Sequence, residues 1–408
     1  MKAAVVGGGL AGLAAALELV DAGHEVTLYE ARPTLGGKVQ TLPEREGDPS
    51  PPPDNGQHVA LGCFGAYLGF LDRIESAGSV ERRRLSLPVI DEAGRVATIG
   101  YGLLPLLRYR HLTLGERLRV ALLVARLRRL EPGMRTFGAF LRAHRQSQRT
   151  IDRFWDVFIR PALNLGTDEV DAGAAVFTVL TALRSGRAAS DLVLPVAPLG
   201  ELHGDAARRA LERAGATVQT GTRVDDLDEL DADLVVVAVP PPEAARLLGE
   251  PDPQLGDSPI VSVHLLFDRR LLGYELAALL GGSAHWVFDR GALTGSEPER
   301  GQYLTVVSSG APELLELRGR ELVERVAAEL TGRLGPAELL WSRVSREPEA
   351  TIALRPGLRR PPPGEISPGV ARAGAWTDGW PPTMEHAVAS GRAAARSLLA
   401  RATTRVHA

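Results

Sequence analysis

A cluster of glycines near the start of the chain has the spacing of a nucleotide-phosphate site. Residues 2–6 predict a short buried strand, and Gly7, Gly9 and Gly12 follow in a turn that opens a helix. The first glycine permits a tight turn, the second lets the backbone approach a pyrophosphate, and the third lets the helix pack against the sheet. The N–H groups at the start of that helix, together with its dipole, attract phosphate. The spacing therefore predicts a turn that binds a dinucleotide.

An acidic residue follows at the distance that ribose recognition requires. Residues 10–22 predict a helix, and residues 25–29 predict a second strand that ends at Glu30. A carboxylate there can accept hydrogen bonds from both ribose hydroxyls and would repel a 2′-phosphate, which disfavours NADP. A G-x-G-x-x-G pattern alone is weak, but here strand, glycines, helix, strand and acid come in order. No second such pattern occurs in the sequence, so we expect no separate NAD(P)H domain.

The residues after the second strand narrow the choice of dinucleotide. Glu30-Ala31-Arg32 is followed by the run Leu-Gly-Gly-Lys at residues 35–38. This arrangement resembles the FAD-binding signature of the amine oxidase and phytoene desaturase superfamily. There the glycine pair and the basic residue lie along the pyrophosphate and the ribityl chain. A P-loop is excluded, because Val39 stands where Ser or Thr should hold magnesium.

The C-terminal part contains a second stretch that resembles this superfamily. Residues 374–385 (GAWTDGWPPTME) match its motif G-D-W-T…G-x-P-x-T-x-E, which leads into a helix. Two departures matter. Ala375 replaces the usual Asp and removes a carboxylate contact to the ribityl hydroxyls, for which Asp378 is the candidate substitute. His386 replaces the usual Gly.

The resemblance implies FAD as the cofactor and assigns its contacts residue by residue. In the superfamily, the residue aligned with Val224 binds adenine through its backbone, and the segment that includes Gly56 and Gln57 returns to the flavin ring. The expected cofactor-binding residues are Gly7, Gly9, Leu10, Ala11, Gly12, Glu30, Ala31, Arg32, Gly37, Lys38, Gly56, Gln57, Val224, Gly374, Thr383 and Met384. We expect no metal site, and the single cysteine, Cys63, excludes a disulfide framework and any metal site built on cysteines.

Three shorter motifs point to one family within the superfamily. Residues 54–58 (DNGQH), the P-x-x-N pattern at residues 161–164 and the segment W-T-D-G-W-P resemble hydroxysqualene dehydroxylases, also called squalene-associated FAD-dependent desaturases. This resemblance implies an isoprenoid lipid substrate and an external electron donor. The implied reaction is reductive removal of the hydroxyl of hydroxysqualene, giving squalene, with reduced FAD as hydride donor.

Such a reaction requires a general acid that reaches the allylic hydroxyl. His58 is the first catalytic candidate and His386 the second. A satisfied polar residue at a strand edge explains His58 equally well. Aromatic side chains such as Trp155 and Trp380 can stabilise an allylic cation through their π faces. Aromatic residues at helical spacing are otherwise typical of a core.

Two other functions share much of this pattern. An oxidative carotenoid-type desaturase would carry the same FAD motifs but add double bonds. A non-enzymatic lipid-binding protein, similar to the escort proteins of prenylated GTPases, would lack working FAD contacts. The complete set of Gly7, Gly9, Gly12 and Glu30 argues against the second function.

The predicted fold is α/β, a Rossmann-type FAD-binding domain (GR2-like flavoprotein fold) interrupted by a mixed α+β substrate domain. Residues 43–54 predict a mobile, proline-rich loop. The FAD-binding domain is expected to comprise residues 1–72, 196–255 and 343–408, and the substrate domain residues 73–195 and 256–342.

Charge and hydropathy indicate where the protein acts. The net charge of −3 gives no indication of a nucleic-acid partner, and no run of about 18 apolar residues predicts a spanning helix. Residues 101–150 hold eleven arginines and two acids, with leucines interspersed. A solvated helix face would explain this, but residues 101–130 can also dock on an anionic membrane surface. We expect a cytoplasmic protein, with peripheral membrane docking through this segment.

Overall fold

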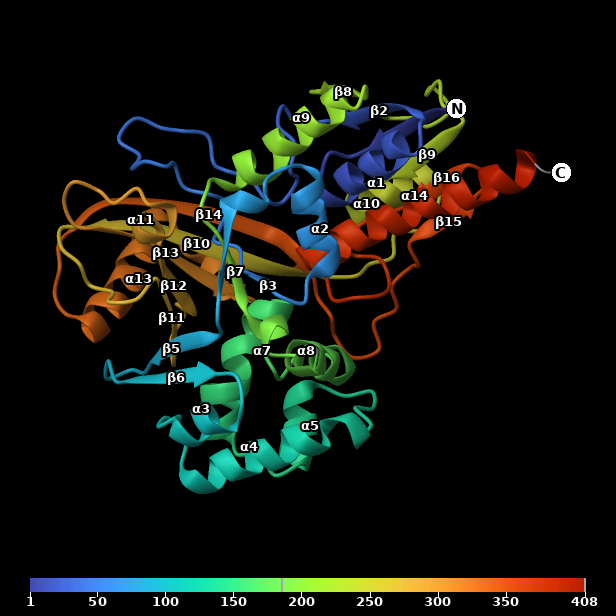
Figure 1. Cartoon of the computed structure of the whole chain (residues 1–408). Coiled ribbons are helices and arrows are strands. Elements are labelled where there is room, and N and C mark those ends of the chain that lie inside the picture. Colours follow the sequence, from blue (N-terminus) through green and yellow to red (C-terminus); the bar gives the residue numbers. More distant parts are fainter. Residues whose placement is uncertain (185, 407–408) are drawn as a thin grey trace.

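A six-stranded sheet carries the glycine-rich turn predicted from the sequence (Figure 1). The computed structural model describes residues 1–184 and 186–406. The strand order is β15-β16-β9-β1-β2-β8, and every neighbouring pair except β15–β16 is parallel. The strands are β1 (Lys2–Val6), β2 (Glu25–Glu30), β8 (Thr217–Thr220), β9 (Leu234–Val237), β15 (Gly364–Ser367) and β16 (Val370–Arg372). Three separated parts of the chain therefore build one sheet.

Two helices pack closely beside this sheet. α1 (Leu10–Asp21) is rich in alanine and lies against α14 (Met384–Val406). A Cβ atom on Gly391 would lie 2.0 Å from the carbonyl oxygen of Ala11, so the close contact of the two helices requires glycine there. Both chain termini lie at this end of the molecule (Figure 1). The packing brings the C-terminal motif to the predicted N-terminal βαβ unit.

A second, seven-stranded sheet forms the other large part, in the order β14-β10-β13-β12-β11-β5-β6. All its neighbouring pairs are antiparallel except β11–β5. Its strands are β5 (Ser86–Ile90), β6 (Val96–Gly100), β10 (Asp257–Phe267), β11 (Leu276–Leu279), β12 (Trp286–Asp289), β13 (Gln302–Ser309) and β14 (Leu339–Ile352). The apolar side of α13 (Gly319–Leu334) packs against β10 and β14. β14 continues this sheet beyond residue 342, where the predicted boundary of the substrate domain lies.

The remaining elements are helices and a small three-stranded sheet, with the strand order β3-β7-β4. Its strands are β3 (Ala60–Leu61), β4 (Val80–Arg83) and β7 (Leu192–Pro195). The principal remaining helices are α2 (Gly65–Arg73), α3 (Leu103–Arg108), α4 (Leu114–Arg126), α5 (Phe137–Ala143), α7 (Asp156–Leu163), α8 (Ala172–Arg184), α9 (Ala206–Arg213), α10 (Pro241–Leu248) and α11 (Arg290–Thr294). Among the described residues, no helix has both the length and the apolar character needed to cross a membrane.

Hydroxyl side chains cap two consecutive helices. Thr136 caps α5, with its hydroxyl accepting a hydrogen bond from the N–H of Ala139. Ser147 caps the next helical segment, which begins at Gln148. The Ser147 hydroxyl accepts from the N–H of Thr150, and the chain continues through a π-helical segment, Ile151–Trp155, into α7.

Candidate functional site

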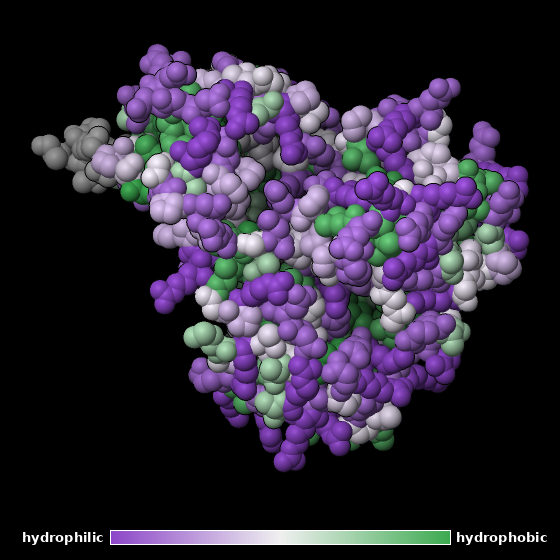
Figure 2. All heavy atoms as spheres, turned by 180° about the vertical axis from the view of Figure 1, so that it is seen from behind, coloured by the Kyte–Doolittle hydropathy of each residue, from purple (hydrophilic) through white to green (hydrophobic). Residues whose placement is uncertain are grey.

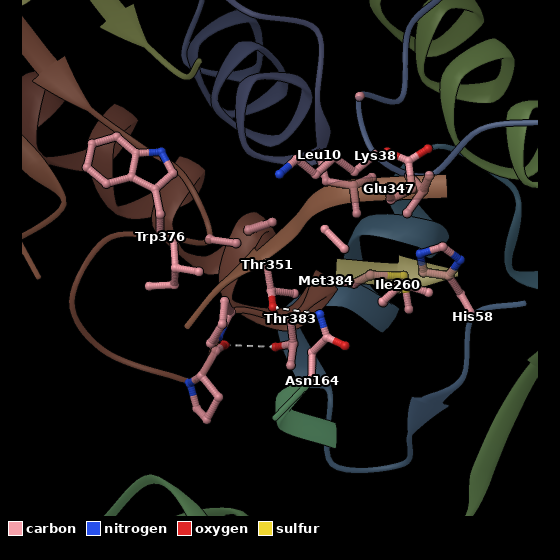
Figure 3. A pocket seen from close by; sticks show the side chains of 18 of the residues that line it. Leu10, Lys38, His58, Asn164, Ile260, Glu347, Thr351, Trp376, Thr383 and Met384 are labelled. Carbon is pink, nitrogen blue, oxygen red and sulfur yellow. Dashed lines mark hydrogen bonds between the residues drawn. The ribbon is translucent and has the colours of Figure 1, made fainter. Parts of the chain in front are cut away.

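A cavity of about 930 Å³ lies between the two large sheets. One end is formed by the glycine turn after β1, the end of β2 and the loop after it. The other end is formed by apolar side chains from β6, β12, α4, α7 and α8. Figure 3 shows part of the wall, where side chains from α1, β10, β14 and the loop segments converge.

The glycine end of the cavity has open backbone donors. Gly9 is the N-cap of α1, no side chain caps this helix, and its first turn contains no acidic residue. Gly37 packs against Gly9, and a Cβ on Gly37 would lie 2.9 Å from the Cα of Gly9. The N-terminus of α1 is therefore free to receive an anion, and the second glycine motif lies directly beside the first.

Glu30 occupies the expected position at the end of β2. Its Oε2 accepts a hydrogen bond of 2.7 Å from the N–H of Gly8, and its Oε1 accepts one of 2.8 Å from the N–H of Arg32. Its carboxylate thus stabilises the glycine turn and also lines the cavity. This position agrees with a role in binding a ribose.

The structure brings nearly all the predicted cofactor residues to one wall, although they come from four separated parts of the sequence. Gly12 is the exception: it is not among the described residues that line the cavity. A Cβ on Gly12 would lie 1.8 Å from the carbonyl oxygen of Gly7, so this glycine lets α1 pack against the turn. The predicted residues that line the cavity are Gly7, Gly9, Leu10, Ala11, Glu30, Ala31, Arg32, Gly37, Lys38, Gly56, Gln57, Val224, Gly374, Thr383 and Met384.

Lys38 links this wall to the second sheet. Its Nζ donates a hydrogen bond to the backbone carbonyl of Glu349 on β14. Burial lowers the pKa of the Lys38 ammonium, and the carboxylates of Glu349 and Asp257 oppose that shift. Lys38 therefore links the loop of residues 35–38 to the second sheet, and it also lines the cavity.

The C-terminal motif keeps its position but lacks the usual carboxylate. Ala375 lines the cavity. Asp378 was the expected substitute, but its side chain is 68% exposed and lies 3.6 Å from Arg360. It is not among the described cavity-lining residues, so it does not replace the missing group. The ribityl end of the predicted site is therefore without this carboxylate.

His386 is not placed for chemistry in the cavity. Its ring is 4% exposed, and its Nε2 lies 2.8 Å from the backbone carbonyl of Thr377. Burial lowers the pKa of His386. Among the described residues that line the cavity, His386 is absent. The structure therefore does not place His386, the second general-acid candidate, on the described cavity wall, because α14 turns its ring into the loop before the helix.

His58 does line the cavity. Its Nδ1 lies 3.1 Å from the carbonyl oxygen of Gly56, which requires a proton on Nδ1 and leaves Nε2 for a second partner. Burial lowers the pKa of His58, and the Gly56 carbonyl and the carboxylates of Asp54 and Glu347 oppose this shift. The residue is therefore placed to exchange a proton with a molecule in the cavity.

Buried ion pairs anchor the segment that leads to His58. Asp54 Oδ2 and Arg290 NH1 lie 2.7 Å apart, and both side chains are 2% exposed. Asp54 Oδ1 also accepts hydrogen bonds from the hydroxyl of Thr41 and the N–H of Leu199. A second buried pair joins Asp48 to Arg343 on β14. Two ion pairs thus hold the proline-rich loop, for which the sequence predicted mobility, at its middle and end, and no sequence motif pointed to either arginine.

Asn164 explains the P-x-x-N motif. It ends α7 in a left-handed conformation with φ of 52°. Its Nδ2 donates to the carbonyl of Ser258 (2.8 Å) and to the hydroxyl of Thr351 (3.1 Å), and its Oδ1 accepts from the N–H of Gly310 (2.7 Å). A dashed line between Asn164 and Thr351 in Figure 3 marks this bond. The motif therefore joins α7 to the strands around the cavity.

Aromatic side chains line the apolar end. Phe154, Trp155 and Phe158 all face the cavity, with ring centroids 5.2–5.8 Å apart. Trp380 also lines the cavity and packs edge-on against Phe177, with centroids 5.2 Å apart. The sequence left a core role and a site role open as alternatives. Trp155 lines the cavity and is also fully buried, so its position is compatible with both roles.

Comparison with known proteins identifies the family. The signature of flavin-containing amine oxidoreductases matches residues 10–399. The chain belongs to this family. Membership makes it a flavin oxidoreductase and explains the open anion site beside Glu30.

Individual relatives are more distant. The hydroxysqualene dehydroxylase of Rhodopseudomonas palustris is 28% identical over 429 residues, covering 97% of this chain and 98% of the relative. A probable zeta-carotene desaturase of Synechococcus elongatus is 24% identical over 477 residues, with 98% of both chains covered. The zeta-carotene desaturase of Synechocystis sp. is 36% identical over 101 residues, which is 25% of this chain and 20% of that relative.

A solved structure supports the fold. A triple mutant of putrescine oxidase is similar with a TM-score of 0.76, at 18% identity, over 98% of this chain and 99% of that chain. The Rossmann-type flavoprotein fold, with a second sheet that completes the cavity, is therefore confirmed.

Proposed function

We propose that this protein binds FAD and reductively removes the hydroxyl of a long isoprenoid alcohol, with hydroxysqualene as the substrate and squalene as the product. The observation that carries the proposal is the continuity of one cavity from the dinucleotide end to an aromatic, apolar end, with His58 on its wall. The similarity to a hydroxysqualene dehydroxylase along nearly the whole chain supports this choice of substrate.

The residues on the cavity wall fit FAD. The uncapped N-terminus of α1 would hold the pyrophosphate, and Glu30 would hold the ribose. Gly37 has no Cβ atom, and a side chain at this position would collide with Gly9. Val224, which lines the same cavity, would contact the adenine through its backbone. When reduced, bound FAD supplies a hydride.

The chain itself contributes a proton donor, an apolar pocket and aromatic faces. Protonated His58 would give the proton on Nε2 to the hydroxyl, which leaves as water and produces an allylic cation. The rings of Trp155 and Phe158 would face that positive charge and keep water away from it. Burial of the isoprenoid chain against these apolar walls would provide most of the binding free energy.

We also propose that the protein takes this substrate from a membrane through the face formed by α3 and α4, here called the α3–α4 surface. Leucines on its outer side are 48–61% exposed: Leu103, Leu104, Leu114, Leu118 and Leu122. Arg108, Arg119 and Arg126 lie exposed on the same helices. Val124 of α4 lines the cavity, so one helix joins the outer face to the substrate end.

The chemical character of this part of the surface supports peripheral docking. In Figure 2, hydrophobic groups alternate with hydrophilic ones in the lower part of the molecule, where α3, α4 and α5 lie in Figure 1. Such a mixed face favours a cytoplasmic protein that rests on an anionic bilayer, with leucines inserted and arginines at the phosphates.

The decisive experiment compares products. Purified protein is incubated with hydroxysqualene or with phytoene, each with the flavin reduced or oxidised. We expect squalene only from hydroxysqualene with reduced flavin. Added double bonds in phytoene with oxidised flavin would replace the proposal by an oxidative desaturase, the activity of the full-length desaturase relative. A colourless protein that binds no flavin would indicate a lipid-binding protein.

The role of His58 is tested in the same assay. We expect His58→Ala to keep its flavin spectrum and to lose about 10²–10⁴-fold in single-turnover rate. Since burial lowers the pKa of His58, the protonated fraction and the rate should fall as the pH rises through a value below that of an ordinary histidine. A variant with the rate and pH profile of the wild type would show that His58 is a spectator.

A further inference from the structure

β14 places a carboxylate on the cavity wall that the sequence did not single out. Glu347 lies opposite Ile260 in the register of β14 and β10, and both residues line the cavity. Figure 3 shows Glu347 beside Lys38, with His58 on the same side of the pocket. The acid therefore lies on the part of the wall that carries the predicted proton donor.

A hydrogen bond ties Glu347 to the segment of His58. Its Oε1 lies 3.3 Å from Nδ2 of Asn55, which also donates to the carbonyl of Lys38 at 2.8 Å. Asn55 is 6% exposed and precedes His58 by one short turn. The contact fixes the carboxylate relative to the histidine, because the Asp54–Arg290 pair holds the same segment from its other side.

We propose that Glu347 is a positioning residue whose carboxylate favours the protonated form of His58, from which the substrate hydroxyl takes the proton. This rests on the proposed function. The proton passes from Nε2 of His58 to the hydroxyl oxygen, and the C–O bond breaks with its electron pair on oxygen. Water would leave, FAD would supply the hydride that the carbon needs when it is bound and reduced, and His58 would regain a proton from solvent.

The charges around His58 explain why Glu347 is the effective partner. Asp54 lies on the same segment, but its carboxylate is already paired with buried Arg290 at 2.7 Å. His203 also interacts electrostatically with His58, but its own pKa is lowered to about 3, chiefly by burial, so it stays neutral. Glu347 forms no ion pair within 4.0 Å among the described residues. Its carboxylate therefore acts both on the Lys38 ammonium beside it and on an imidazolium at His58.

The same strand supplies a matched control. Glu349 lies two residues further along β14, also lines the cavity and carries the same charge. Its carboxylate acts on Lys38, as that of Glu347 also does, and on Asp257. Replacing Glu349 by Gln removes a carboxylate from the same strand and wall while the Asn55–Glu347 contact stays in place.

The test measures the His58 ring directly and does not depend on turnover. Histidine signals of isotope-labelled, flavin-loaded protein are followed by NMR across pH, and His58→Ala identifies the His58 signal. We expect Glu347→Gln to reduce the protonated fraction of His58 at pH 7 roughly threefold to tenfold. Glu349→Gln should leave this fraction unchanged, and Glu347→Asp should restore part of it.

Single-turnover reduction of hydroxysqualene then links the charge to the chemistry. The rate in Glu347→Gln should fall by the same factor as the protonated fraction, with its pH profile moved to lower pH. An unchanged His58 titration in Glu347→Gln, or an equal change in Glu349→Gln, would overturn the proposal. If Glu347→Gln does not fold, an unchanged titration in Glu347→Asp would do so. No squalene from any variant, with the titration changed as expected, would contradict the proposed function alone.

Discussion

The contact between Glu30 and the glycine turn makes a quantitative prediction about cofactor binding. In the structure, the carboxylate accepts hydrogen bonds of 2.7 and 2.8 Å from the N–H groups of Gly8 and Arg32. Glu30→Ala removes the acceptor from both groups and from the ribose hydroxyls that we assign to it. A hydrogen bond to a charged group contributes about 1.5–3 kcal/mol, more than one between neutral groups.

We therefore expect Glu30→Ala to weaken FAD binding by about 1–3 kcal/mol, which is a factor of about 5 to 150 in Kd. Glu30→Gln keeps one acceptor oxygen but loses the charge. Its Kd for FAD should therefore lie between those of Glu30→Ala and the wild type. Glu30→Ala also removes the hydrogen bonds that link Gly8 and Arg32 through the carboxylate, which should lower the thermal stability of the apo-protein.

The measurement is a titration of apo-protein with FAD, followed by quenching of flavin fluorescence. Glu25→Ala is the matched control, because Glu25 begins the same strand with its side chain exposed to solvent. We expect its Kd to equal that of the wild type. Equal affinity of Glu30→Ala and wild type would refute the assignment of the ribose to Glu30.

Two further variants test other parts of the structure. Ala375→Asp restores the carboxylate missing from the C-terminal motif and should tighten FAD binding about tenfold in the same titration, since a charged hydrogen bond is gained; an unchanged Kd would mean that the ribityl chain lies elsewhere. Replacing the exposed Arg126, Arg128 and Arg129 by Gln should weaken binding to anionic liposomes by on the order of 1 kcal/mol per charge, less at high salt, while the fold is kept. Wild-type protein that never sediments with such liposomes at low salt would contradict docking through the α3–α4 surface.

The sequence by itself predicted the parts of the site whose conformation is local. The strand, glycine turn, helix and second strand of the N-terminal unit lie where the residues predicted, with α1 over Leu10–Asp21 and β2 over Glu25–Glu30. Glycine spacing and helix capping act within a few residues, so they can be recognised without knowing the fold. The resemblance to a known superfamily added the distant residues Val224 and Gly374, which do line the same cavity.

The tertiary structure decided the surroundings of those residues. Whether a histidine faces the cavity depends on how its element packs. His58 and His386 were the first and second candidates in sequence, and of these two His58 lines the cavity. The carboxylate of Glu347 reaches the His58 segment because β14 pairs with β10 in a particular register. Arg290 lies on α11, far from Asp54 in the sequence, and the tertiary packing brings the two side chains together. Contacts of this kind depend on the packing of residues far apart in the chain, and that information lies in no single stretch of sequence.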